Sequence, residues 1–302
     1  MADLDLRPLS LGEILDRTFS LYRRNFVLFV GIVALPYLLV LALNLVQSTR
    51  LPLTVSGGQT PAVNNNPFAG GIMGLATIIV SLFAYLFSQG GSVFAVSDLY
   101  LGRQTTIGQS FSRMRGELGS LFGILFFNGL LVFGAPAACF FTAIVARAPA
   151  LIFLGFALLF FPGFYFACRL LVCVPAGLLE DLGPRASVER SFGLTKDNAG
   201  RAFIIYVLYI ILIWATASVL TWPFAAGVVA SKNSPEMVRI WLALTQVGSF
   251  IANVLVGPFL TIAAAVFYYD LRVRKEAFDL QLMMNPSGNI PSGTAGVPHT
   301  LS

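Results

Sequence analysis

The residue types that most often carry enzyme chemistry are scarce in this sequence and lie far apart. Histidine occurs once, as His299, in a Pro-, Gly- and Ser-rich tail. Hydrolysis at a membrane needs a nucleophile with a general base, or a metal held by histidine and carboxylate ligands. Three cysteines lie in apolar runs, and their number and spacing indicate buried thiols, without a CxxC pair or a disulfide framework: Cys139, Cys168 and Cys173. We therefore expect no catalytic centre, no metal and no cofactor.

A few charged residues remain as candidates for a binding site. Glu180 and Asp181 are adjacent and could together bind a cation, although acids at a helix end beside arginines more often form ion pairs. Arg169 is the one charged residue inside an apolar run, where a charge costs about 2.5–3.5 kcal/mol on insertion scales. In one interpretation it forms a structural ion pair with an acid at the end of a run: Asp98, Glu180 or Asp270. In the other it binds a lipid phosphate or a substrate.

Long apolar runs dominate the rest of the chain, which is 57% hydrophobic and 11% charged, with a mean hydropathy of +0.80. A helix needs about 20 apolar residues to cross the hydrocarbon core of a bilayer, where the backbone must satisfy its own hydrogen bonds. Runs of that length cover Phe26–Val46, Ala69–Ser97, Leu118–Ala146, Ala148–Cys168 (continuing to Leu179), Ala202–Ser231 and Ile240–Tyr269. We predict an all-α membrane protein with six transmembrane helices arranged as three helical hairpins.

Lysine and arginine are distributed unevenly between the connections. Most of the 19 lie in the N-terminal segment, in the second and fourth connections, or just after the sixth run. Because positively charged residues are retained on the cytoplasmic side, this pattern predicts a multi-pass protein of the cytoplasmic (inner) membrane with both termini in the cytoplasm. The net charge of +5 is an orientation signal, and no basic patch interleaved with aromatic residues indicates nucleic-acid binding.

Short polar segments that precede three of the runs resemble one another, which predicts an internal repeat. When residues 106–123 are aligned with residues 187–204, Ser110 meets Ser191, and a weaker copy begins near Leu15. The aromatic and basic positions shared by the three copies are Phe19, Arg23, Phe111, Arg115, Phe192 and Lys196. The predicted units cover about 9–97, 98–180 and 181–275, each a short cytoplasmic helix followed by a transmembrane hairpin.

The short helices are expected to be amphipathic and to lie at the membrane surface. Ser10 followed by Glu13, and Thr106 followed by Gln109, have the spacing of a capping box. Aromatic side chains on such helices face the lipid, and basic residues meet anionic headgroups, each contributing about 1 kcal/mol. The first helix forms an N-terminal segment over 1–25, followed by a membrane domain over 26–280 and a disordered cytoplasmic tail over 281–302.

Three segments together resemble a known family: LRPLSLGEILDRTFSLYRRNF, PAGLLEDLGPRASVERSFGLTK and YYDLRVRKEAFDL. They are similar to the bacterial glycerophosphoryl diester phosphodiesterase membrane-domain family and related uncharacterised multi-pass proteins, over about Leu6 to Leu280. The family takes its name from proteins in which this membrane part precedes a soluble phosphodiesterase barrel. The tail after the sixth run is far too short for a barrel of about 250 residues. The resemblance therefore implies a membrane module without phosphodiesterase activity.

These observations favour a non-enzymatic integral membrane module that interacts with lipids, or that serves as an accessory or scaffold to a partner protein. The expected partners are anionic lipid headgroups on the cytoplasmic face and a membrane or cytoplasmic protein, with no nucleic acid. The alternative is a small transporter or channel that uses Arg169 and the proline-broken spans. A third hypothesis is the membrane part of a glycerophosphodiester-processing system.

Overall fold

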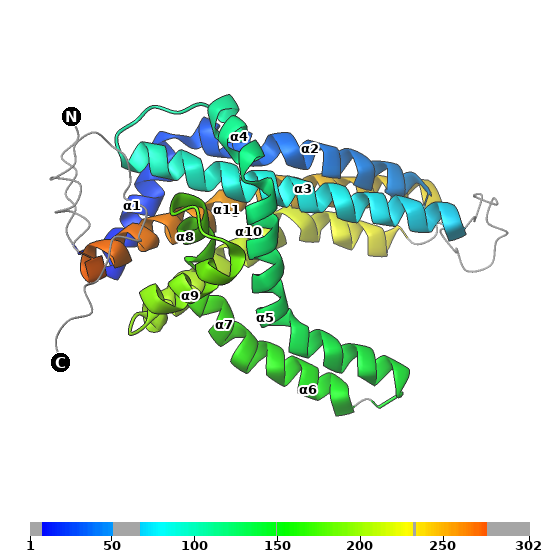
Figure 1. Cartoon of the computed structure of the whole chain (residues 1–302). Coiled ribbons are helices and arrows are strands. Elements are labelled where there is room, and N and C mark those ends of the chain that lie inside the picture. Colours follow the sequence, from blue (N-terminus) through cyan, green and yellow to red (C-terminus); the bar gives the residue numbers. More distant parts are fainter. Residues whose placement is uncertain (1–7, 51–66, 149, 232–233, 277–302) are drawn as a thin grey trace.

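The computed structural model describes residues 8–50, 67–148, 150–231 and 234–276, and within these ranges the chain is helical and contains no strand (Figure 1). Six segments are long and apolar enough to cross a membrane: Phe26–Ser48, Gly71–Tyr100, Leu118–Val145, Ala150–Leu179, Ala199–Ala230 and Pro235–Glu276. The prediction of an all-α, multi-pass membrane protein is confirmed. The tail predicted to be disordered, with His299, lies outside the described residues.

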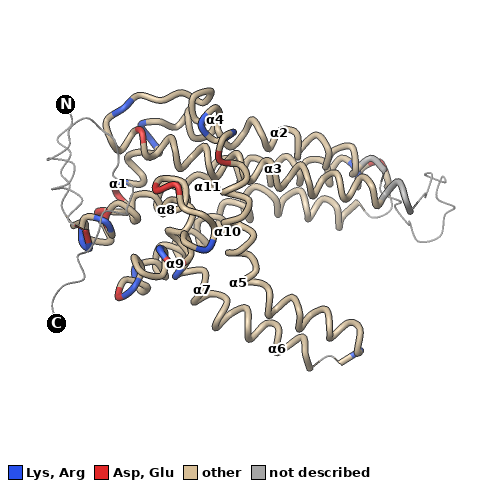
Figure 2. The backbone as a smooth tube through the Cα atoms, viewed as in Figure 1, with Lys and Arg blue, Asp and Glu red and all other residues tan. Residues whose placement is uncertain are grey.

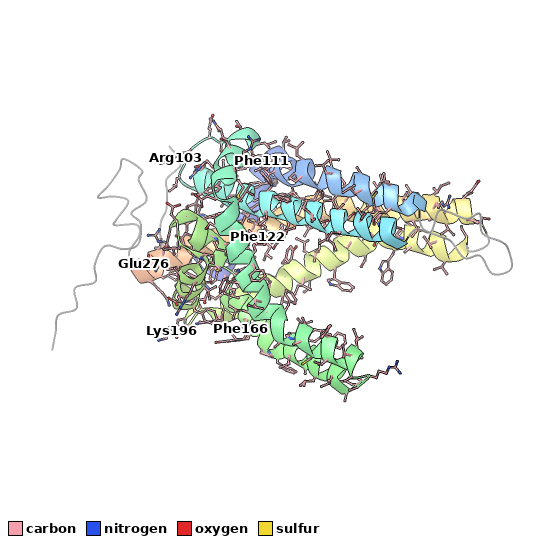
Figure 3. The ribbon with its side chains drawn as sticks, turned by 45° about the vertical axis from the view of Figure 1, so that its right-hand side comes forward. Arg103, Phe111, Phe122, Phe166, Lys196 and Glu276 are labelled. Atoms are coloured by element: carbon pink, nitrogen blue, oxygen red, sulfur yellow. The ribbon has the colours of Figure 1, made fainter. Side chains whose placement is uncertain are left out.

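The spans pack as hairpins that form two arms. Helix α2 (Phe26–Arg50) packs on α3 (Pro67–Tyr100), α5 (Leu118–Val145) on α6 (Ala150–Leu158), and α10 (Ala199–Ala230) on α11 (Pro235–Glu276). In Figure 1, α2 and α3 run together with part of α11, whereas α6 and the outer part of α5 diverge from them. The turned view in Figure 3 shows the same separation. The two arms meet at the end of the molecule where α1, α4, α8 and α9 lie.

Helix α11 is the centre of the packing. In its most apolar window 67% of the residues are buried within the protein, compared with 6–22% in the other five spans. It contacts α1, α2, α3, α8, α9 and α10. Its C-terminal part buries Phe267, Tyr268 and Tyr269 completely, and the ring of Tyr269 stacks on that of Tyr100 from α3 at 4.6 Å between centroids. The C-terminal half of α11 is therefore surrounded by protein, whereas most residues in the apolar windows of the other five spans are not buried.

The fourth span, which the sequence marks as one long apolar run with prolines inside it, is broken. It consists of α6, a π-helical turn η1 (Leu159–Gly163), α7 (Phe164–Arg169) and α8 (Cys173–Leu179). Pro162 lies inside η1 and has no N–H to donate, so the helix widens locally. Pro175 cannot donate to the carbonyl four residues earlier, on Leu171, and the chain leaves the helical path at residues 170–172.

Three short helices lie across the end of the bundle: α1 (Leu11–Arg24), α4 (Ile107–Gly116) and α9 (Pro184–Thr195). Both predicted capping boxes are present, because the Ser10 and Thr106 side chains accept from the backbone N–H groups of Glu13 and Gln109. Helix α9 begins with Pro184 at its first position, where a missing N–H costs no hydrogen bond. Helix α1 packs on α11, α4 on α3, and α9 on α5 and α8, so one side of each helix faces protein.

Helices α10 and α11 pack closely against each other at Gly248. A Cβ atom at this position would overlap the backbone carbonyl oxygen of Leu220. Small residues at such a crossing let two transmembrane helices pack backbone to backbone. By contrast, a Cβ atom at Gly74 in α3 would meet nothing within 4 Å.

We predict that Gly248→Leu destabilises the protein, because the added side chain forces α10 and α11 apart, and overpacking of this kind costs about 1–3 kcal/mol. Thermal loss of monodisperse protein in detergent, followed by size-exclusion chromatography, measures the effect. Gly74→Leu is the matched control and should melt like the native protein. Equal melting temperatures for the two variants would contradict the packing described for this crossing.

Candidate functional site

Most charged residues lie at the end of the molecule where the short helices lie, as the coloured backbone in Figure 2 shows. The acids singled out in the sequence are all at this end: Asp98 near the end of α3, Glu180 directly after α8, and Asp270 near the end of α11. Each has arginine partners at this end, but Arg169 is not among them. The structure therefore brings the predicted candidates to one end of the bundle and assigns them to separate groups.

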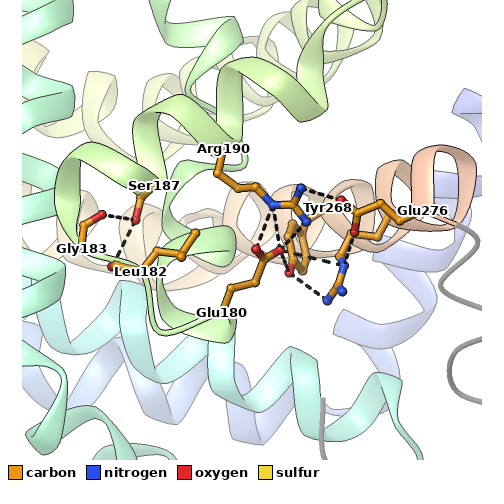
Figure 4. Close-up of polar contacts among 8 residues, drawn as sticks. Glu180, Leu182, Gly183, Ser187, Arg190, Tyr268 and Glu276 are labelled. Atoms are coloured by element: carbon orange, nitrogen blue, oxygen red, sulfur yellow. Dashed lines mark hydrogen bonds and ion pairs between the residues drawn. The ribbon is translucent and has the colours of Figure 1, made fainter. Parts of the chain in front are cut away.

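Glu180 is the centre of the most buried group (Figure 4). Its side chain is 2% exposed, and its carboxylate accepts from Arg190 Nε at 2.8 Å and from the Tyr268 hydroxyl at 2.7 Å. Arg190 also pairs with Glu276, which in turn accepts from Arg272 Nε at 3.0 Å. Burial lowers the pKa of Arg190, but its hydrogen bonds and charge interactions with Glu276 and Glu180 outweigh that effect and leave the pKa raised. The group links α9 to the end of α11.

Asp270 holds the entry into α1. Its side chain is fully buried. One carboxylate oxygen accepts the backbone N–H of Leu9 at 2.7 Å, and the other accepts from Arg201 and Arg274 at 2.8 and 2.9 Å. The same two arginines donate to the carbonyl oxygen of Leu9. The backbone N–H and carbonyl of Leu9, which precedes α1, are therefore both bound by side chains from α10 and α11.

Asp98 forms the third group, and Asp181 stands apart. Asp98 Oδ1 accepts from Arg113 in α4 at 2.9 Å, and the Arg113 guanidinium lies 4.6 Å from the centroid of the Phe94 ring. Asp181 is exposed and has a φ of 52°, whereas its neighbour Glu180 is buried. Among the described residues no three His, Cys, Asp or Glu side chains are placed to hold a metal ion.

Arg169 contacts the last turn of α9 and, among the described residues, forms an ion pair with none of the three acids, which does not support the first of the two interpretations. It donates to the carbonyl oxygen of Phe192 at 2.8 Å, and its guanidinium lies 4.9 Å from the centroid of the Phe192 ring. Lys275 donates to the carbonyls of Gly193 and Lys196 nearby. Two cations thus cap the C-terminus of α9, where carbonyls without helical partners and the helix dipole favour positive charge. No pattern in the sequence indicates this arrangement, because it depends on where α9 ends.

The break after Arg169 is closed by hydroxyl groups from α9. The Arg169 carbonyl oxygen accepts from Ser191 Oγ at 2.7 Å and from Thr195 Oγ1 at 3.2 Å. At the start of the same helix, Ser187 Oγ donates to the Gly183 carbonyl at 2.9 Å (Figure 4). Arg169 Nε is buried and has no hydrogen-bond partner in the described structure.

The aligned positions of the short helices occupy similar surroundings. Phe19 contacts Phe259, Phe111 contacts Phe87, and Phe192 contacts Phe166, with ring centroids 4.7, 5.7 and 6.2 Å apart. Phe87, Phe166 and Phe259 belong to the second, fourth and sixth spans. Figure 3 labels Phe111 and Phe166. The aligned hydroxyl residues are fully buried: Thr18, Ser110 and Ser191. The aligned basic residues are exposed: Arg23, Arg115 and Lys196. The repeat itself stays a prediction.

An apolar cleft of about 670 Å³ lies between α5 and the helices of the other arm. Its lining comes from α3, α5, α7, α8, α10 and α11, and it includes Phe122, which Figure 3 labels. Phe126 and Phe133 line the cleft yet are 59% and 57% exposed, so the cleft opens at the surface of the protein. None of the described residues that line it is charged. Sequence reasoning missed it, because the divergence of α5 from the bundle leaves no mark in an apolar run.

A smaller chamber of about 90 Å³ adjoins the cleft. Tyr85, Gln89 and Thr261 line both spaces, and Thr261 donates to Gln89 Oε1 at 2.8 Å. Ser88 and Ser92 also line the chamber, and their buried hydroxyls have no partner in the described structure. The sequence contains a signal for this chamber, because the polar residues Ser88 and Ser92 stand four positions apart inside the second apolar run.

No family model, curated protein or solved structure matches this chain. The fold and the contacts define a multi-pass integral membrane protein with arginine–carboxylate groups buried at one end and an uncharged cleft among its spans.

We predict that Glu180→Gln destabilises the protein strongly, since removal of one partner from a buried ion pair typically costs about 3–5 kcal/mol. Asp181→Asn is the matched control, one residue away and exposed, and should have little effect. Thermal unfolding of the two purified variants in the same detergent measures the difference. If Asp181→Asn lowers the melting temperature as much as Glu180→Gln, the burial of the Glu180 group does not stabilise the fold as described.

Proposed function

We propose that this chain is a non-enzymatic protein of the cytoplasmic membrane that binds membrane lipids within its transmembrane region. The observation that carries the proposal is the cleft beside α5. Its volume of about 670 Å³ falls in the range of ligand-binding pockets, about 300–1,000 Å³. Its lining is mostly apolar, and exposed aromatic side chains mark its opening. In a bilayer such an opening faces acyl chains, which are the ligands present there at high concentration.

The charged end supports the same proposal. We infer that this end lies in the cytoplasm, as the distribution of lysine and arginine predicts. Exposed Arg23, Arg115 and Lys196 then lie near the headgroups of an anionic leaflet. The matching contacts of the three aligned phenylalanines support a threefold repeat of short helix and hairpin.

The broken fourth span favours transport as the second candidate. Ala167, Leu170 and Pro175 line the cleft at the break, and Arg169 lies beside them with an unpartnered Nε. Interrupted helices near mid-membrane often form the substrate sites of transporters. Arg169, however, is engaged with the end of α9, which gives it a structural role in the resting structure.

We predict that Gly129→Phe reduces the lipid that copurifies with the protein severalfold. Gly129 lines the cleft, and a Cβ atom there meets nothing within 4 Å, so the aromatic ring fills the cleft without displacing backbone. Native mass spectrometry of protein extracted in a mild detergent measures the bound lipid. Gly119→Phe, on the same helix but outside the cleft and equally open, is the control. Undiminished lipid in Gly129→Phe would refute lipid binding in the cleft.

For Arg169→Ala we expect a less stable protein whose expression in a deletion strain leaves solute uptake as it is with the native protein. The loss of stability follows from the lost contact with the Phe192 carbonyl at the end of α9. Uptake of labelled solutes, normalised to the amount of folded protein, separates the two candidates. A specific loss of uptake at equal protein level would favour the transporter over the lipid-binding module.

A further inference from the structure

Two serine hydroxyls in α3 are buried without a hydrogen-bond partner. Ser88 is 6% exposed and Ser92 is 1% exposed, and neither Oγ has a partner in the described structure. Hydroxyls in transmembrane helices usually donate to the carbonyl four residues earlier. Thr142, Thr221 and Thr245 of this chain do so, at 2.7–2.8 Å. Because a buried polar group without a partner is destabilising, the two serines point to a ligand that supplies the missing hydrogen bonds.

The surroundings of the two hydroxyls are polar and uncharged. Ser88 and Ser92 lie one helical turn apart on the same face of α3 and line the chamber of about 90 Å³, a volume equal to about three water molecules. The other side chains with hydrogen-bonding groups come from α2, α10 and α11 as well as α3: Tyr37, Tyr85, Gln89, Tyr209, Asn253 and Thr261. A phosphate or carboxylate at this depth would require arginine or lysine, and none lines the chamber.

The polar chamber and the mostly apolar cleft adjoin, so together they fit a molecule with one polar end and one hydrocarbon chain. Tyr85, Gln89 and Thr261 line both spaces, so a molecule whose hydrocarbon chain lies in the cleft can place its polar end among the serines. The chamber is too small for a phosphocholine or sugar headgroup. A hydroxyl group can both donate to and accept from the two serines.

We propose that the chamber binds the uncharged hydroxyl headgroup of a single-chain lipid whose hydrocarbon chain occupies the cleft. The inference rests on the proposed lipid binding and adds the chemistry of the headgroup. Ser88 and Ser92 complete their hydrogen bonds with this headgroup, and the Gln89–Thr261 hydrogen bond lies where the headgroup and the chain join.

The test is photolabelling of the full-length protein in nanodiscs with hexadecanol that carries a diazirine in its chain. Unlabelled hexadecanol should compete at least tenfold better than hexadecylphosphocholine, which has the same chain but a large charged headgroup. Ser88→Ala/Ser92→Ala should lose this tenfold preference while its melting temperature without ligand stays equal or rises, since two unpaired hydroxyls are removed. Ser81→Ala, on the same helix outside the chamber, should keep the preference.

The remaining outcomes separate this inference from the lipid-binding proposal. If the double serine variant keeps the preference for the alcohol, the hydroxyls hold only water and the inference is overturned. If glycerol without a hydrocarbon chain competes equally well, the ligand is a soluble polyol and the inference is also overturned. If both hexadecyl compounds compete equally and Gly129→Phe abolishes labelling, lipid binding stands and the headgroup assignment fails. If the native protein is not labelled at all, both fall.

Discussion

The buried carboxylates at the end of the bundle determine how the helices meet. Asp270 and Glu180 are almost completely removed from solvent, and a buried carboxylate is tolerated only when charges and hydrogen bonds surround it. Asp270 meets this requirement with Arg201, Arg274 and the Leu9 N–H, and Glu180 meets it with Arg190 and Tyr268. These partners come from α9, α10 and α11 and from Leu9, which precedes α1. The four elements therefore cannot separate without exposing a buried charge or removing its partner.

Strong attachment at one end leaves the arms free to diverge at the other. Transmembrane helices gain little from burying apolar surface against one another, because lipid tails are as apolar as leucine side chains. Helix α11 and its neighbours pack through small residues such as Gly248, whereas α5 leaves the bundle beyond the charged end. The cleft exists because of this difference. The polar residues of α3, α10 and α11 that would otherwise face lipid gather around the small chamber beside it.

The sequence could predict what depends on length, composition and local spacing. Six spans followed from the length of the apolar runs, and the two capping boxes from Ser10 with Glu13 and Thr106 with Gln109. An ion pair between Glu180 and a nearby arginine was the favoured interpretation of that residue, and the structure shows it with Arg190. The sequence left the partner of Arg169 open, because its contact with the Phe192 carbonyl depends on where α9 ends. The break at residues 170–172 depends on Pro175 and on the α9 hydroxyls that bind the Arg169 carbonyl oxygen, and the sequence does not show that these hydroxyls lie beside it. The cleft and the chamber depend on the relative directions of helices, which no local pattern records.

Helix α1 leaves the ribosome long before α11, because the hydrogen bond between Leu9 and Asp270 joins residues 261 positions apart. At about 5–20 residues per second, α1 waits on the order of 10–50 s before its final partner is made. During that interval the face that later covers α11 has no protein to pack against, and the membrane surface is the place where an amphipathic helix is stable. Assembly of this end is therefore a step that follows the insertion of all six spans. A chain that stops before α11 lacks Asp270, so that neither Arg201 nor the Leu9 N–H has this carboxylate to bind.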